Sequence, residues 1–550
     1  MSSKSSAPGL SPLAILFVAL ALSIGWGVRG NWGHEYGAMI PGALAAMAAV
    51  IASGRDDWYR RIAYFACFGA LGWSFGGSIS YMMVIGYTHS GQTASVIYGF
   101  ACLFLIGFLW GAMGGAGTAV PAFLSRERLT ELVIPVTAVL VAWLGQDIFF
   151  NVYLGGLRAQ VTQGTLTQEQ FAAQTAWIDW YDSDWIAPIV ASAAVLIVAI
   201  IRWRVCWGTS LVLAMSAGWW LGFTLLVIGM GLRMTPPRGD NWAGALGMTV
   251  ALFVFLYRTR ETGIAWTALV TGLFGGLGFS GATLIKLILV HPVLQQRVFG
   301  GEISANWHSV LEQTFGFISG IGVALAMGHL STRTPRQNDD PPVRAWTEPL
   351  VVLFVLLVVT YVNIVKNVAN TWTPKPDQPG AMTLLESEMW GISSYTWFNL
   401  AYAVLAVVIA WPLLAWYRGR RIDTVPASRL GKAQLLFIVF LWWIVIGNLA
   451  RTVPFAPQRL ITEGVIHVNA CLCTLLALLL PSRERIAGED PAPDFSLMLP
   501  RTVGAAILIG AIAIVGEFAL ARGLWGDKFA GHARYHPRFS FEPQTLEKNE

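Results

Sequence analysis

The chain has 550 residues, of which 55% are hydrophobic and only 12% are charged. Soluble proteins carry about 25% charged residues, so this composition excludes an ordinary soluble enzyme. The net charge of +5 is small and its cations are scattered, which excludes a nucleic-acid partner. The five cysteines lie in or beside apolar stretches without metal-finger spacing. We therefore expect no structural disulfides, no metal and no cofactor.

Apolar blocks of about 20 residues, the length that crosses a bilayer, recur along the chain. They predict an all-α polytopic membrane protein with about fifteen transmembrane helices, and the bilayer is its first partner. The first block follows Lys4 and runs through Gly25 to Arg29 without a small-residue cleavage site, so we interpret it as a retained helix. The helices are expected to begin near residues 11, 36, 62, 93, 129, 185, 208, 241, 264, 307, 348, 396, 433, 462 and 500.

Lys and Arg concentrate in alternate connections between these helices. Arg55, Arg60 and Arg61 follow the second helix, for example, and each later connection on the same side holds at least two cations. The positive-inside rule then predicts a cytoplasmic N-terminus, and we expect the plasma (inner) membrane of a bacterium. An odd number of helices places the tail on the extracytoplasmic side.

Four short segments recur in the same order, at separations that rise from 204 to 217 residues. This order is typical of a duplication with loop insertions. The pairs are Ile24–Arg29 with Ile228–Arg233, Phe68–Ser74 with Phe274–Ser280, Ala112–Gly114 with Ala326–Gly328, and Thr130–Leu132 with Thr347–Pro349.

The duplication divides the chain into two parallel six-helix repeats, followed by three further transmembrane helices. Six is an even number, so the two repeats share one orientation and are related by an axis along the membrane normal. The predicted boundaries are 1–205 and 206–425 for the repeats, 426–525 for the three additional helices, and 526–550 for the extracytoplasmic tail.

The loop after the second helix reads Gly54-Arg55-Asp56-Asp57-Trp58-Tyr59-Arg60-Arg61. The two parallel six-helix halves resemble the layout of major facilitator superfamily transporters, which carry G-x-x-x-D-R-x-G-R-R in the loop between their second and third helices. Here the acid stands one place early and the second glycine is absent. The resemblance implies a substrate site between the two halves.

Ionisable residues inside the predicted spans are candidates for function, because each costs at least about 2.5 kcal/mol to insert. They collect near the outer helix ends. Arg29 and Arg233 share a G-x-G-x-R context that favours a ligand or ion-pair role, although snorkelling to the headgroups is the alternative. The residues expected to line one outward-opening, solute-binding cavity are Arg29, His34, Glu35, Asp147, Arg233 and Lys286.

A second polar set is a candidate for a proton relay or for ion pairs: Glu463, His467, Asp240 and Lys366. Glu463 and His467 lie four residues apart and share a helix face. The glycine-rich segment 29–37 predicts a broken helix that lines a cavity, with an ordinary outer loop as the alternative. Cations outnumber acids among the intramembrane groups, which favours an anionic or polyhydroxylated ligand.

Three functions remain open on the sequence. A transporter for a small solute is favoured over an enzyme, because the chain lacks a nucleophile motif, a phosphate loop and a soluble catalytic domain. The second is a membrane-embedded transferase or hydrolase with Glu35 or Asp147 as its base. The third is a non-catalytic subunit of a membrane complex. The three C-terminal helices would provide the surface for a homo- or hetero-oligomer.

Overall fold

The fold is given by a computed structural model of the chain. The residues that it describes are 11–29, 36–76, 79, 81–90, 92–176, 186–203, 205–234, 241–301, 303, 305–337, 346–362, 366–374, 383–417, 431–452, 460–480, 494–526 and 538–539.

Helices make up almost all of the described chain, which confirms the all-α class. Its α-helices are α1 (Pro12–Arg29), α2 (Met39–Ser53), α3 (Asp56–Arg60), α4 (Ile62–Gly76), α5 (Met82–Tyr87), α6 (Thr93–Phe123), α7 (Arg126–Thr162), α8 (Gln168–Thr175), α9 (Ile186–Arg202), α10 (Trp207–Gly222), α11 (Asn241–Arg258), α12 (Thr262–Leu289), α13 (Pro292–Phe299), α14 (Trp307–Arg333), α15 (Thr347–Leu353), α16 (Lys366–Trp372), α17 (Ser394–Tyr417), α18 (Lys432–Thr452), α19 (Leu460–Leu479) and α20 (Phe495–Trp525).

Two π-helical segments and four two-residue strands complete the described structure. The π-helical segments η2 (Phe223–Gly229) and η3 (Phe354–Val359) continue α10 and α15. Strand β1 (Leu232–Arg233) pairs antiparallel with β4 (Arg538–Phe539), and β2 (Glu388–Met389) pairs antiparallel with β3 (Ile392–Ser393).

Nine helices in the described part of the chain are long and apolar enough to cross a membrane. They are α1, α6, α7, α10 with η2, α12, α14, α18, α19 and α20. A helix begins within about five residues of each of the fifteen expected starting points. Several of these helices, α2, α4 and α9 among them, are shorter than a span. The chain is thus an integral membrane protein, while fifteen crossings remain a prediction.

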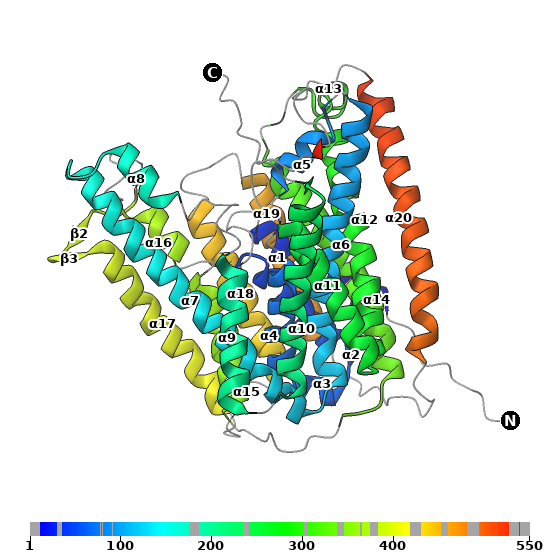
Figure 1. Ribbon diagram of the computed structural model, residues 1–550, viewed down its shortest axis with the longest axis horizontal. Helices are drawn as coiled ribbons and strands as arrows, with labels where there is room; N and C mark the ends of the chain where they lie inside the picture. The colour runs from blue at the N-terminus through cyan, green and yellow to red at the C-terminus, as the bar shows by residue number, and fades with distance from the viewer. Residues whose placement is uncertain are drawn as a thin grey trace.

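The centre of the bundle is formed by α1, α4, α6, α12 and α14, as Figure 1 shows. Helix α20 stands at one side of this centre against α12, and α7, α9 and α17 lie on the other side. We call the lower end of the bundle in Figure 1 the α3 end and the upper end the α8 end.

Small residues let α6 and α12 approach until their backbones touch. A Cβ on Gly107 would lie 2.2 Å from the carbonyl oxygen of Gly275, so neither helix tolerates a side chain there. The Thr271 hydroxyl donates to the Gly111 carbonyl across the same interface at 2.8 Å. Glycine-mediated packing of this kind is common between membrane helices. It joins the predicted first half of the chain closely to the second.

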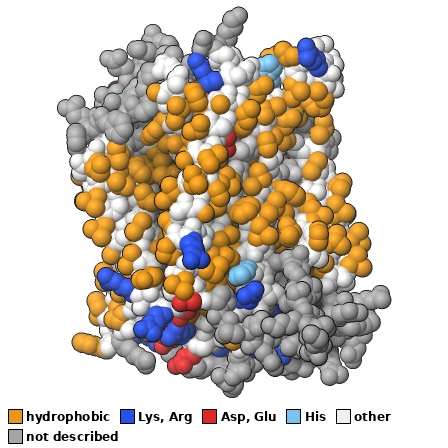
Figure 2. Space-filling view, turned by 90° about the vertical axis from the view of Figure 1, so that its right-hand side faces the viewer, with side chains coloured by type: hydrophobic (Ala, Val, Ile, Leu, Met, Phe, Trp, Pro, Cys, Tyr) orange, Lys and Arg blue, Asp and Glu red, His pale blue; other side chains and the backbone are white. Residues whose placement is uncertain are grey.

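The outer faces of the bundle expose many large apolar side chains. Figure 2 shows a broad hydrophobic face on which charged side chains gather mainly towards one end. Helix α20 contributes Ile507, Leu508, Ile512 and Val515, each more than half exposed. So large an exposed apolar surface marks a protein or membrane contact, and the apolar spans favour lipid here.

Candidate functional site

Among the described residues of the predicted spans, the most deeply buried ion pair joins α1 to α14. Arg29, the last residue of α1, is only 2% exposed and donates from Nη1 to Oε1 of Glu312 at 2.9 Å. Glu312 is completely buried in the second turn of α14. The cation at a helix C-terminus and the acid near a helix N-terminus both complement the helix dipoles. The pair thereby brings together residues 283 positions apart in the sequence.

Two further side chains extend this ion pair into what we call the Glu312 cluster: Arg29, Tyr81, His308 and Glu312. The Tyr81 hydroxyl accepts from Arg29 at 3.0 Å and donates to Oε1 of Glu312. Nε2 of His308 lies 3.2 Å from the Tyr81 oxygen and 3.5 Å from Oε1 of Glu312. Because the His308 side chain is 28% exposed, it connects the buried carboxylate to the surface of the structure.

Aromatic rings enclose the Arg29 side of the cluster. The guanidinium carbon of Arg29 lies 4.9 Å from the Trp26 ring centroid and 5.1 Å from that of Trp110. These two indoles stack on each other at 4.9 Å. Cation–π contacts stabilise a desolvated guanidinium, and the apolar walls lower the local dielectric, which strengthens the pull between the charges.

The second carboxylate oxygen of Glu312 takes no part in these hydrogen bonds. Oε2 is buried and has no hydrogen-bond partner among the described residues. An unsatisfied buried acceptor costs about 1 to 3 kcal/mol, so native proteins rarely keep one without a purpose. The oxygen is therefore available to a proton, to water or to a rearranged side chain.

A cavity of about 480 Å³ lies among helices from both predicted halves, namely α4, α6, α7 and α9 from the first and α10 and α11 from the second. One face of α7 runs along it, because its lining residues recur at spacings of three and four. These residues include Leu132, Val136, Val139, Trp143 and Asp147.

Four polar residues gather in one part of the mostly apolar cavity wall, and we call this part the Asp147 section: Tyr36, Gln146, Asp147 and Asn241. The Tyr36 hydroxyl donates to Oδ2 of Asp147 at 2.6 Å. Oε1 of Gln146 is buried and lacks a hydrogen-bond partner in the described structure. The section thus presents oxygen acceptors to whatever occupies the cavity.

The structure places the residues expected in one cavity at different points. Asp147 lines the cavity, whereas Arg29 belongs to the Glu312 cluster and is not among the lining residues. Lys286 is partly buried on α12 and is also not among the lining residues. His34 and Glu35 lie outside the described residues, as does the side chain of Arg233, whose backbone forms β1.

The second predicted set is described only in part. Glu463 is buried on α19 and accepts a hydrogen bond from the Asn448 amide. Nδ1 of His467 lies 2.7 Å from the backbone oxygen of Glu463, one helical turn away. Asp240 and the side chain of Lys366 lie outside the described residues. A proton-relay role for Glu463 and His467 stays a prediction.

Sequence reasoning missed Glu312, His308, Tyr81 and Tyr36. The rule that singled out Arg29 would also have found Glu312, because it is an acid within an apolar run and follows His308 by four residues. The two tyrosines carry no comparable signal, since a tyrosine near a membrane interface is common.

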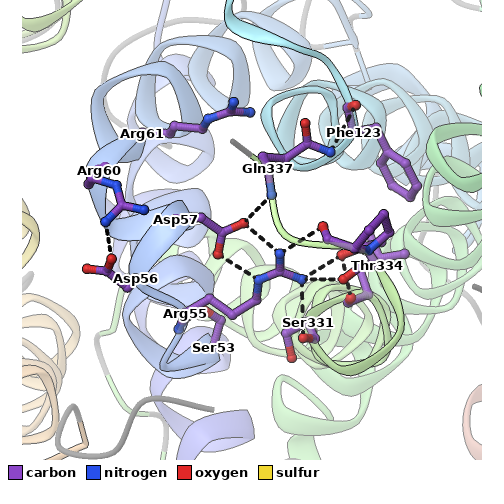
Figure 3. Close-up of polar contacts among 12 residues, drawn as sticks. Ser53, Arg55, Asp56, Asp57, Arg60, Arg61, Phe123, Ser331, Thr334 and Gln337 are labelled. Carbon is purple, nitrogen blue, oxygen red and sulfur yellow. Dashed lines mark hydrogen bonds and ion pairs between the residues drawn. The ribbon is translucent and has the colours of Figure 1, made fainter. Parts of the chain in front are cut away.

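A second buried arginine, Arg55, connects the start of α3 to the segment that follows α14. Arg55 is 1% exposed and donates from Nε and Nη2 to the two carboxylate oxygens of Asp57, at 2.9 and 2.6 Å. Its Nη1 donates to the backbone oxygen and the hydroxyl of Thr334, both at 2.8 Å, just after α14 ends. Figure 3 shows this group, which we call the Arg55 clamp: Arg55, Asp57, Thr334, Pro335 and Gln337.

The clamp satisfies the charge of Asp57 as well as that of Arg55. The backbone amide of Gln337 donates to Oδ2 of Asp57 at 3.1 Å. Burial acts to raise the pKa of Asp57, but the hydrogen bonds and positive charge of Arg55 outweigh it, so the pKa lies below the ordinary aspartate value. The clamp is thus a fully bonded structural element.

No protein-family model matches the chain, and no curated protein sequence matches it. The functional argument therefore rests on the residues and geometry given above.

Proposed function

We propose that the chain is a multi-pass membrane transporter for a small solute, which binds in the cavity that contains Asp147. The observation that carries the proposal is a cavity at membrane depth that is lined by helices of both predicted halves and holds a carboxylate. Transporters with repeated halves bind their solute at such an interface, and rocking of the halves opens it to either side.

Helix packing supports the two-repeat organisation within 1–425. Helices α1 and α2 pack together, as do α10 and α11, their expected counterparts. The pair α4 and α6 likewise has its counterpart in α12 and α14. The same neighbours within each half are what a duplication would leave.

The Glu312 cluster contains an ion pair that could couple relative motion of the two halves to the binding of a proton or ion. Arg29 comes from the first half and Glu312 from the second, so relative motion of the halves would break or reform their ion pair. Ionisable groups buried inside a bundle commonly mark ion or proton pathways. His308 gives the carboxylate its route to solvent.

The chemistry of the Asp147 section narrows the expected solute. Its carboxylate, amide and phenol oxygens accept or exchange hydrogen bonds with hydroxyl groups. An ionised Asp147 would repel an anion, because like charges at short range raise the energy of both. Of the two expected classes, a polyhydroxylated solute is therefore favoured over an anionic one.

Cations at the α3 end support the proposed orientation in a bacterial inner membrane. Arg60, Arg128 and Lys432 all belong to connections or helix starts at this end, where Arg128 pairs with Glu261 and Lys432 with Glu348. The positive-inside rule assigns such an end to the cytoplasm.

Uptake into proteoliposomes tests the function. The purified chain should accumulate at least one member of a panel of radiolabelled polyols and sugars, and Asp147→Asn should lower that uptake at least tenfold. Val152→Asn, on an exposed part of α7, is the matched control and should leave uptake unchanged. Equal uptake by Asp147→Asn and wild type would contradict the proposal. Chemical conversion of a probe without accumulation would instead favour the membrane enzyme.

A further inference from the structure

The length of the cavity is unusual for a site that holds only a small solute. Its lining residues on α7 extend from Leu132 to Leu154, which is about 33 Å at 1.5 Å per residue. The hydrocarbon core of a bilayer is about 30 Å thick. The lining on α7 is therefore long enough to run through most of the membrane depth.

Outside the Asp147 section the cavity wall is mostly apolar, and its other polar lining residues are Ser74, Ser192 and Ser216. From Leu132 to Asp147 it extends about 22 Å. Side chains along this part include Val120 from α6, Leu211 and Met215 from α10, and Leu252 from α11. Asp147 is the one charged residue among the described residues that line the cavity. A polyol would leave this long apolar part without a matching surface.

The Asp147 section, in contrast, favours a polar group that can donate hydrogen bonds. Oδ2 of Asp147 accepts a hydrogen bond from the Tyr36 hydroxyl, and the buried Oε1 of Gln146 has no hydrogen-bond partner in the described structure. A hydroxyl or similar donor at this height would complete the hydrogen bonding of Gln146. The cavity thus combines a long, mostly apolar lining with one section that offers hydrogen-bond acceptors.

We propose that the cavity binds an amphiphile with a single long alkyl or prenyl chain. The alkyl or prenyl chain of this ligand lies between α6, α7, α10 and α11. Its hydroxyl-bearing head lies against Asp147 and Gln146. This inference rests on the cavity assigned under the proposed function and names the class of its solute. It unites the favoured polyhydroxylated head with the apolar lining of the remaining cavity.

Photolabelling of the purified full chain tests the proposal. The probe is a sixteen-carbon alcohol with a diazirine near the end of its chain, and the labelled peptides are identified by mass spectrometry. Label is expected on the lining segments of α6, α7 and α10. Excess unlabelled hexadecanol should lower this labelling at least fivefold, whereas glycerol and inositol should leave it unchanged.

Two matched pairs of variants separate cavity binding from contact with the outer surface. Val139→Trp fills the cavity, while Val141→Trp places the same ring on the 62%-exposed side of α7. We expect labelling to fall at least fivefold in the first and less than twofold in the second. Ala191→Phe and its exposed neighbour Ala193→Phe form an equivalent pair on α9, should Val139→Trp fail to fold.

Three results would overturn the inference: equal labelling of the cavity-filling variants and the wild type, label confined to outward-facing residues, or displacement of the probe by glycerol or inositol. The last result would indicate a small polar ligand. Because labelling requires no transport, binding without uptake would defeat the proposed function alone. Uptake of a polyol without cavity labelling would defeat this inference alone.

Discussion

The Arg55 clamp and the Glu312 cluster lie towards opposite ends of α14, and both bury an arginine beside an acid. In the clamp, Arg55 and the Gln337 amide satisfy both oxygens of Asp57. In the cluster, Arg29 and Tyr81 both bond to Oε1 of Glu312, and Oε2 has no partner among the described residues. Buried charges alike in type can therefore serve different purposes.

The contrast shows that burial of a charge does not by itself indicate function. A carboxylate whose oxygens are all bonded holds two segments together, and it loses much if any partner is removed. A carboxylate with a spare acceptor and a partly exposed histidine beside it can change its partners. Completeness of bonding separates the clamp from the candidate functional cluster.

The largest expected effect is the loss of the clamp. Arg55→Ala leaves Asp57 buried without its cation and removes the donors to Thr334 and Pro335, so we expect about 3 to 5 kcal/mol of lost stability. The thermal unfolding temperature in detergent checks this. Arg60→Ala removes a half-exposed pair with Asp56 and should cost at most about 1 kcal/mol. Equal losses in the two variants would contradict the comparison.

The next effect concerns the Glu312 cluster and sharpens the comparison. Glu312→Leu leaves Arg29 buried without its acid and should cost about 3 kcal/mol. Combining it with Arg29→Met should restore most of that stability, because an apolar pair replaces a buried ion pair at little cost. Uptake should remain lost in the double variant. A double variant that transports normally would show that the cluster is only structural.

Acid should weaken the clamp. The pKa of Asp57 is lowered in the folded chain, so its contribution to stability is complete above the ordinary aspartate pKa of about 3.9 and is lost as the pH falls through the lower folded value. Asp57→Asn should lower the unfolding temperature at pH 7, and its difference from wild type should shrink below about pH 4. A difference that is constant from pH 7 to pH 3 would exclude this linkage.

The smallest effect on stability is expected from cysteine substitutions at exposed positions. Their labelling reports which end of the bundle faces the cytoplasm. In a Cys471→Ser background, which removes the exposed cysteine, Thr167→Cys at the α8 end should react with an impermeant thiol reagent in intact cells. Asp56→Cys, at a 51%-exposed position of the α3 end, should react only after the membrane is opened. The reverse pattern would invert the proposed orientation.

The helices could be predicted from the sequence because the signal is local. An apolar run of bilayer length must form helix, since lipid offers no partner for backbone groups. That argument located a helix near every expected start and brought Arg29 and Asp147 to attention as costly charges. It could not find Glu312 as the partner of Arg29, because pairing across 283 residues leaves no local trace.

The sequence by itself determined the membrane class, the helix positions and the candidate charges, because each depends on residues close together in the chain. Tertiary structure alone decided that Asp147 lines a long apolar cavity while Arg29 pairs with Glu312. Helices that are apolar on all sides have no pattern that reveals which face meets which neighbour. That choice follows from packing contacts such as those of Gly107 with Gly275, which form only when the helices assemble.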